Sequence, residues 1–319
     1  MQSRRGFLKN TTLLTVAIAF PLSDIFAELE MKNQMGIQLF SLPKMLSEDF
    51  EKGIKMLSSM GYKELELYGP FPFSTEAAQK RWAAVTPQLG FSGSGYFGKN
   101  IKDVKKILTD NGLSTPAMHT DMDTLIKGMD KLGEAAHVLG QKYVTLPSIP
   151  DELRKNLDDY KRIAETFNKI GENAKKNGIK FGYHNHGYGI KPMEGQIPLQ
   201  IILDQTDPNL VFFELDIFWT ASGGADPIDY LTKYPNRYKM LHLKDMKEKK
   251  EFSGDGGNAS QWIPLFGNMT TAGDGVLDLK GIVNKAKDIG VEHYFVEQDM
   301  VASPEIALKR SLEYLKPKI

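Results

Sequence analysis

The sequence predicts a (β/α)8 barrel, in which eight parallel strands form a closed ring inside a layer of helices. Three observations support this prediction. Short apolar runs alternate with amphipathic stretches from residue 35 onward, as in repeated βα units. Eight of these runs have the length of strands, and several end in polar side chains. The length of 319 residues suits one such barrel with insertions and an N-terminal extension.

The predicted strands and helices follow one another in order along the chain. The strands cover residues 36–40, 64–68, 115–119, 143–146, 180–184, 210–217, 239–243 and 294–296. A helix covers residues 49–60, because apolar residues recur there at helical spacing, and Gly61 ends it. Another helix covers residues 157–176. No linker divides residues 28–319, which predicts a single barrel domain, with an open doubly wound sheet as the alternative.

Residues 1–27 have the features of an export signal. The pair Arg4-Arg5 precedes an apolar run over residues 13–20, and the small residue Ala27 follows. This segment resembles the bacterial twin-arginine signal, which predicts a periplasmic or otherwise exported protein. An ordinary secretion signal and an uncleaved anchor are the alternatives. Because the apolar run is far shorter than the ~20 residues of a spanning helix, no membrane span is expected in the mature chain.

Composition limits the classes of partner and of metal site. The formal charge is +0, and no run rich in Lys and Arg occurs beyond the N-terminus, so nucleic acid is not expected as a partner. The chain contains no cysteine, so any metal site must use histidines and carboxylates. A homo-oligomer is compatible with the sequence.

The most informative residues lie at the C-terminal ends of four predicted strands. They form the motifs Tyr183-His184-Asn185-His186, Glu214-Leu215-Asp216, His242-Leu243-Lys244-Asp245 and Glu297-Gln298-Asp299. In a barrel of parallel strands these ends meet at one mouth, where enzymes of this architecture place their active sites. Alternate residues of a strand face the same side, so the polar residues of each motif are expected to share a face. The sequence therefore predicts an active site at this mouth.

Four of these residues form a candidate metal site. Asp216, His242 and Glu297 lie on three consecutive predicted strands, and His184 on the strand before them would complete the set. Imidazole and carboxylate ligands suit a divalent metal ion such as Mn²⁺, Mg²⁺ or Zn²⁺. The alternative is that all four are hydrogen-bonded structural groups.

Further motifs carry a resemblance to a known family. They cover residues 213–219, 224–227, 234–237 and 273–275, in addition to the four motifs above. Together they resemble the sugar phosphate isomerase/epimerase group of xylose isomerase-like barrels, over essentially the whole chain after the export signal. That group includes ketose 3-epimerases, inosose dehydratases and, more distantly, a DNA repair endonuclease.

Resemblance to the 3-epimerases implies metal ligands at Asp216, His242 and Glu297. The fourth ligand in those enzymes is a glutamate, and this chain has His184 at the matching position. Two glutamates form the acid/base pair of those epimerases, so the departure argues against simple 3-epimerisation of a free ketose. A second departure is Gly189, where related exported members often carry a glutamate.

The catalytic candidates follow from the chemistry of such a metal ion. A divalent ion chelated by a carbonyl and an adjacent hydroxyl polarises the carbonyl and stabilises an enediolate formed by deprotonation. His186, His119 and Glu297 are the candidate bases. For His119 the alternatives are orientation of a substrate hydroxyl and packing as a core histidine. Lys244 is expected to bind a substrate oxygen or stabilise the enolate, with a surface ion pair to Asp245 as the alternative.

The remaining candidates contact the substrate or orient a ligand. Glu66 is expected to bind sugar hydroxyls, and Trp219 or Tyr68 to stack on a sugar face, with ordinary packing as the alternative for each. Glu214 is expected to orient a metal ligand. The insertion over residues 247–274 is longer than typical βα loops, which predicts a lid, with a subunit contact or a disordered insertion as the alternative.

These residues predict a divalent-metal-dependent sugar isomerase or epimerase that acts through an enediolate on a sugar or keto-sugar. The first alternative is a metal-dependent lyase or dehydratase that eliminates water or an aglycone from an inosose or 3-keto-glycoside. The second is a sugar-binding barrel without catalysis. A phosphodiesterase like the repair endonuclease is disfavoured by the neutral charge. In each of the first three cases the expected partner is a small sugar or sugar derivative.

Overall fold

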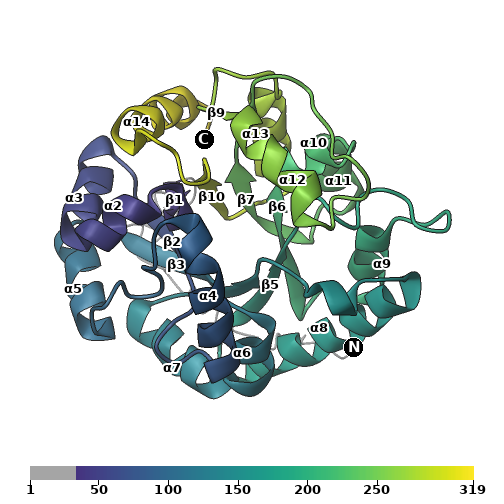
Figure 1. Ribbon diagram of the computed structural model, residues 1–319, viewed down its shortest axis with the longest axis horizontal. Coiled ribbons are helices and arrows are strands. Elements are labelled where there is room, and N and C mark those ends of the chain that lie inside the picture. The colour runs from purple at the N-terminus through teal and green to yellow at the C-terminus, as the bar shows by residue number, and fades with distance from the viewer. Residues whose placement is uncertain (1–33) are drawn as a thin grey trace, which may run out of the picture. The chain divides into compact units, whose positions relative to one another are not determined.

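The computed structural model describes residues 34–319, whose strands close into an eight-stranded parallel barrel (Figure 1). The export signal predicted for residues 1–27 lies outside the described residues. Around the ring, the strand order is β1-β10-β7-β6-β5-β4-β3-β2, and β1 pairs with both β2 and β10. The closed barrel confirms the prediction, and the open doubly wound sheet is wrong.

The barrel strands agree with the predicted ranges to within two residues at each end. They are β1 (Met35–Gln38), β2 (Glu64–Tyr68), β3 (Ser114–His119), β4 (Tyr143–Leu146), β5 (Lys180–His184), β6 (Val211–Asp216), β7 (Tyr238–Leu243) and β10 (His293–Val296). The first strand was predicted to reach Phe40 but ends at Gln38. The side-chain oxygen of Gln38 accepts a hydrogen bond from the Phe40 amide, and this contact starts the 3-10 helix η1 (Leu39–Ser41).

Helices surround the strands on the outside of the barrel (Figure 1). They are α2 (Pro43–Glu48), α3 (Phe50–Met60), α4 (Glu76–Leu89), α5 (Ile101–Asp110), α6 (Met122–Lys127), α7 (Met129–Leu139), α8 (Leu157–Lys176), α9 (Pro198–Gln205), α10 (Ile217–Ser222), α11 (Pro227–Lys233), α12 (Ala259–Trp262), α13 (Leu279–Asp288) and α14 (Pro304–Leu315), with the short 3-10 helices η2 (Asp151–Leu153), η3 (Ile263–Asn268) and η4 (Lys316–Lys318). Helix α8 has its predicted bounds, and Gly61 ends α3 in the left-handed conformation that glycine adopts without strain. None of the described helices has the length and apolar composition that crossing a membrane requires.

The barrel interior contains an apolar layer between the polar strand ends at the mouth and the buried Glu64–His293 pair at the N-terminal ends of the strands. Ala117, Tyr143, Met240 and Phe295 form this layer, each from a different strand. Gly36 leaves room for Phe295, because a Cβ atom at position 36 would lie 2.5 Å from the Phe295 ring. This layer fills the middle of the barrel, so the polar side chains at the strand ends above it lie on the side of the C-terminal mouth.

The insertion over residues 247–274 contains α12, η3 and the short strand β9 (Met269–Thr270). Strand β9 pairs antiparallel with β8 (Asp245–Met246). The disordered-insertion alternative is therefore wrong. The ring of Phe252 stacks on Trp219 with centroids 5.7 Å apart, and the insertion thereby lies at the mouth of the barrel. Its role as a lid stays a prediction.

Candidate active site

A layer of polar side chains crosses the barrel above the apolar layer. Its members point inward from β1, β2, β3, β5, β6 and β7, and all are buried: Gln38, Glu66, His119, His184, Glu214 and His242. The predicted alternation of inward residues is confirmed by the register, which places His184 beside Glu214 and Asp216 beside His242. Strands far apart in the sequence thus contribute to one cluster.

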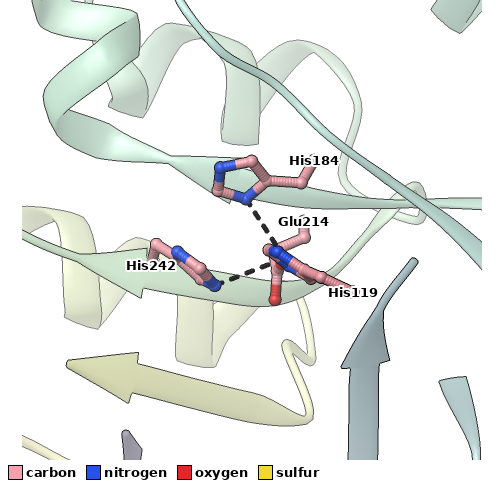
Figure 2. A group of neighbouring side chains, drawn as sticks. All are labelled: His119, His184, Glu214 and His242. Atoms are coloured by element: carbon pink, nitrogen blue, oxygen red, sulfur yellow. Dashed lines mark hydrogen bonds and ion pairs between the residues drawn. The ribbon is translucent and has the colours of Figure 1, made fainter. Parts of the chain in front are cut away.

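Three histidines surround one oxygen of Glu214 (Figure 2). The Oε2 atom of Glu214 lies 2.7 Å from His119 Nε2, 3.1 Å from His184 Nδ1 and 3.3 Å from His242 Nε2. The rings of His119 and His242 are almost parallel, with centroids 5.3 Å apart. Glu214 was predicted to orient one metal ligand, and it contacts three imidazole rings.

Glu66 joins this network instead of facing open space. Its Oε2 atom lies 2.7 Å from His242 Nε2 and 3.2 Å from His119 Nε2, and it accepts a hydrogen bond from Gln38. Its side chain has no exposed surface. Glu66 thus holds the histidines, and its predicted contact with sugar hydroxyls stays a prediction.

A second group of charged side chains lies on the mouth side of this layer. The ammonium group of Lys244 lies 3.0 Å from Asp216 Oδ2, 2.7 Å from Glu297 Oε2 and 2.7 Å from Asp299 Oδ2. The Lys244 side chain is only 2% exposed, so the surface ion-pair alternative is wrong. Asp245 instead accepts hydrogen bonds from backbone amides of the turn that follows residue 272, among them that of Gly273.

Local structure explains the position of Asp216. As the last residue of β6 it also caps α10, because its Oδ1 atom accepts a hydrogen bond from the Trp219 amide at 2.8 Å. Its own amide donates to the side-chain oxygen of Asn185. The Oδ2 atom is buried and faces the Lys244 ammonium group at 3.0 Å. One oxygen of Asp216 therefore holds no backbone contact and would be available for a ligand if Lys244 moved.

The mouth-side donors suit a divalent metal ion. Ligand atoms of Asp216, His242 and Glu297 lie within 4.8 Å of one another, and His184 Nε2 lies 3.6 Å from Asp216 Oδ2. The opposite nitrogens, His184 Nδ1 and His242 Nε2, face Glu214 and Glu66. Histidine ligands of metals usually donate their other N–H to a carboxylate in this way, which fixes the tautomer.

A deeper group of donors also lies within 4.8 Å, comprising His119, His184, Glu214 and His242. Here the nitrogens that face inward already contact Glu214 or Glu66. The mouth-side group contains two carboxylates whose present counter-charge is Lys244. We therefore assign this group the better fit to an ion, and the deeper group a role in orienting the histidines.

The charges of the cluster explain its pKa shifts. Burial disfavours the charged form of His119, but the carboxylates of Glu66 and Glu214 prevail and raise its pKa to about 9. Burial also disfavours the charged form of His242, but the carboxylates of Glu214 and Glu297 outweigh burial and raise its pKa well above the ordinary value. In contrast, burial and the nearby His242 lower the pKa of His184 well below its ordinary value.

Excess negative charge remains on the mouth side. Burial raises the pKa of Asp216. Burial and the charge of Glu297 raise the pKa of Asp299 to about 6. Burial favours the protonated form of Glu297, but the charges of Lys244 and His242 outweigh burial and lower its pKa. Carboxyl groups that retain their protons because they are buried and repel one another would be stabilised in their charged form by a divalent cation.

The other predicted residues lie at different distances from this cluster. His186 is half-buried at the mouth, with its ring 5.0 Å from that of His184 and 5.9 Å from that of Trp219. Burial and the charge of Lys244 lower the pKa of His186 to about 3, so its imidazole is neutral at physiological pH. The Trp219 ring lies 5.5 Å from the Lys244 ammonium. Both residues border the charged group.

Tyr68 packs elsewhere at the mouth. Its ring contacts Phe40, Trp82 and Phe97, and its hydroxyl donates to the carbonyl of Gly93. The Tyr68 ring already packs against these neighbours, and its predicted stacking on a sugar stays a prediction.

Two residues that support the site were not predicted from the sequence. Gln38 holds Glu66, and Asn185 holds the backbone of Asp216. The alternation rule could have identified Gln38, because it is a polar residue at the end of a strand and faces inward. Asn185 lies between two motif histidines and faces α10, where its side chain donates to Thr220.

Comparisons with known proteins agree with the barrel fold. Residues 54–318 match the family described as the xylose isomerase-like TIM barrel. The chain belongs to this family. Inosose dehydratase from Clostridium perfringens is 35% identical over 279 residues, which are 84% of this chain and 90% of that protein.

Solved structures of xylose isomerase-like barrels resemble the chain as well. A sugar phosphate isomerase/epimerase from Parabacteroides distasonis is 28% identical, with a TM-score of 0.66 over 89% of this chain and 93% of that one. The IOLI protein, whose structure is described with a binding zinc atom, has a TM-score of 0.62 at 14% identity and covers 90% of this chain and 96% of its own. The latter likeness concerns the fold alone. The relatives named here on sequence identity are enzymes.

Proposed function

We propose that this protein is a divalent-metal-dependent lyase that eliminates water or an aglycone from a keto-cyclitol or keto-sugar, with inososes and 3-keto-glycosides as the substrate classes. The observation that carries the proposal is the mouth-side donor group of His184, Asp216, His242 and Glu297, supported on its inner side by Glu66 and Glu214. The resemblance to inosose dehydratase, over 90% of the length of that enzyme, favours elimination.

The metal ion would be held by His184 Nε2, Asp216 Oδ2, His242 Nδ1 and Glu297 Oε2. When bound, such an ion supplies Lewis acidity that polarises a substrate carbonyl and eases removal of the neighbouring proton. The ligand set fits Mn²⁺, Mg²⁺ or Zn²⁺, and the zinc atom in the IOLI structure is a reason to test zinc first.

Two residues beside the donor group would then act on the substrate. His186 is neutral and half-buried, so its imidazole can accept the proton from the carbon next to the carbonyl. Asp216, Asp299 and Glu297 outweigh burial and raise the pKa of Lys244 well above its ordinary value, so Lys244 keeps its proton and can donate a hydrogen bond to the oxygen on the following carbon. The proton taken up by His186 passes to that oxygen, the carbon–oxygen bond breaks, water or an aglycone leaves, and a carbon–carbon double bond forms beside the carbonyl. His186 is then neutral again, as at the start.

An isomerase or epimerase is the second candidate, because the Parabacteroides distasonis structure of that description is 28% identical. The 3-epimerases that the chain resembles use two glutamates as acid and base, and His184 replaces one of them here. The Nδ1 atom of His184 is engaged with Glu214, so this ring does not replace the lost carboxylate as a base. A sugar-binding barrel without catalysis would not need four intact metal donors.

Proton NMR in D₂O distinguishes the three candidates. The chain, without residues 1–27, is incubated with Zn²⁺ or Mn²⁺ and with an inosose, a 3-keto-glycoside or a free ketose. Loss of water or of the aglycone supports the lyase. Deuterium entering a product that keeps all its atoms would establish an isomerase or epimerase instead. Tight sugar binding without metal and without any change in the sugar would establish a binding protein.

We further propose that the chain is exported and meets non-phosphorylated substrates. The twin-arginine-type segment of residues 1–27 motivates export, and the five carboxylates of the cluster would repel a phosphate group. Replacement of Arg4 and Arg5 by lysine should retain the protein in the cytoplasm, as cell fractionation would show. Periplasmic recovery of this variant in normal amounts would exclude the twin-arginine route.

A further inference from the structure

Lys244 places a cation of the chain itself at the metal donors. Its Nζ atom lies 3.0 Å from Asp216 Oδ2 and 2.7 Å from Glu297 Oε2, and both oxygens belong to the proposed ligand set. A metal ion would lie about 2.0–2.2 Å from each of these oxygens. An ammonium group at its present position would then lie within a few ångströms of a divalent ion, and the two cations would repel each other strongly.

Asp299 is a partner that this ammonium group could keep after leaving Asp216 and Glu297. Its Oδ2 atom accepts a hydrogen bond from Lys244 at 2.7 Å, and it does not belong to the proposed ligand set. Asp299 also lines a cleft of about 390 Å³ between the insertion and the segment that precedes α14, so there is space on its outer side. The face of the Trp219 ring lies 5.5 Å from Nζ and favours a cation in this part of the mouth.

We propose that Lys244 is an internal counter-cation, which holds Asp216 and Glu297 together in the metal-free protein and shifts toward Asp299 when a divalent ion binds. The inference rests on the proposed metal site and adds a role for Lys244 and Asp299. Two properties follow. Metal affinity depends on competition with the lysine. The metal-free protein needs the lysine for stability, because the buried carboxylates of Asp216 and Glu297 and the half-buried one of Asp299 would otherwise face one another.

The test measures binding of Mn²⁺ alone, with free Mn²⁺ counted by electron paramagnetic resonance. Lys244→Met should bind Mn²⁺ about tenfold or more tightly, and Asp299→Asn should bind it several-fold more weakly, since coupled charges at this distance interact strongly. Lys239→Met removes the same charge from the other end of β7, where Lys239 faces Glu292, and should leave the affinity within about twofold of the parent.

A double variant separates displacement from a general effect of charge. If Asp299 acts only by receiving the lysine, the Asp299→Asn change should have no effect on Mn²⁺ affinity in the Lys244→Met background. Additive effects of the two changes would overturn the inference. Thermal melting adds a readout that does not depend on affinity. Metal-free Lys244→Met should melt roughly 5 °C or more below the parent, and saturating Mn²⁺ should remove most of this difference.

Binding of Mn²⁺ by the parent protein distinguishes failure of this inference from failure of the proposed metal site. If the parent binds Mn²⁺ and both single variants bind it equally well, only the displacement is wrong. If the parent binds no divalent ion and Asp216→Asn changes nothing, the metal site itself is wrong and the inference falls with it.

Discussion

The Oε2 atom of Glu66 lies 2.7 Å from Nε2 of His242, while Nδ1 of the same ring lies 2.7 Å from Glu297. The two contacts hold the imidazole between a carboxylate in the deeper layer and one at the mouth. Glu66 and Glu297 come from β2 and from the end of β10, so three separate strands define the orientation of this ring. His242 is therefore a rigid ligand candidate.

Glu66→Gln should weaken metal binding by about tenfold, because carboxylates that orient histidine ligands typically contribute 10- to 100-fold to affinity. The amide can still accept a hydrogen bond but carries no charge. Glu64→Gln is the matched control, since Glu64 lies on the same strand and pairs with His293 at the other end of the barrel. Titration with Mn²⁺ would measure both. Equal loss in the two variants would show that Glu66 acts only through general stability.

Asp216→Asn should abolish turnover and reduce Mn²⁺ affinity by more than about a hundredfold, since it removes a charged ligand. Asparagine also caps helices well, so α10 should remain intact. Asp226→Asn is the control, because Asp226 caps α11 in the same way and lies outside the cluster. Metal content after gel filtration and circular dichroism would be measured together. A fully active Asp216→Asn enzyme would exclude the proposed site.

The stability of the metal-free protein should fall as the pH rises from about 6.5 to about 9. His119 has a pKa raised to about 9, so its protonated form is favoured by folding. This contribution is fully present below the unfolded pKa near 6.5 and is lost as pH passes the folded pKa. It amounts to about 3 kcal/mol at most. Urea unfolding of the parent and of His119→Gln, in the presence of a chelator, would isolate it. A difference between the two that is independent of pH would contradict the assignment.

Gly187→Ala should displace the insertion from the mouth. A Cβ atom at position 187 would overlap the ring of Phe252, which stacks on Trp219. If the insertion is a lid, KM should rise several-fold and proteases should cut residues 247–274 faster, because closure and exclusion of water would be impaired. Gly267→Ala is the control, since no atom lies within 4 Å of a Cβ atom there. Unchanged KM and cleavage rates would argue against a lid.

The fold followed from the sequence because local patterns determine strands and helices. Residues 64–68, 143–146 and 180–184 were predicted with the bounds that the structure has, as was helix α8. The alternation of inward side chains also identified His184, Asp216, His242 and Glu297 as neighbours at one mouth. These properties depend on period and order along the chain, which the sequence contains directly.

Only the tertiary structure decided which side chains from distant strands contact one another. Residue order alone does not show that Glu66 contacts His242, 176 positions away, or that Lys244 lies between Asp216, Glu297 and Asp299. These contacts depend on barrel closure and on the register between strands, which set the level of each side chain along the axis. The sequence by itself therefore determined which residue types reach the mouth, and the packing of the closed barrel decided which charges face one another there.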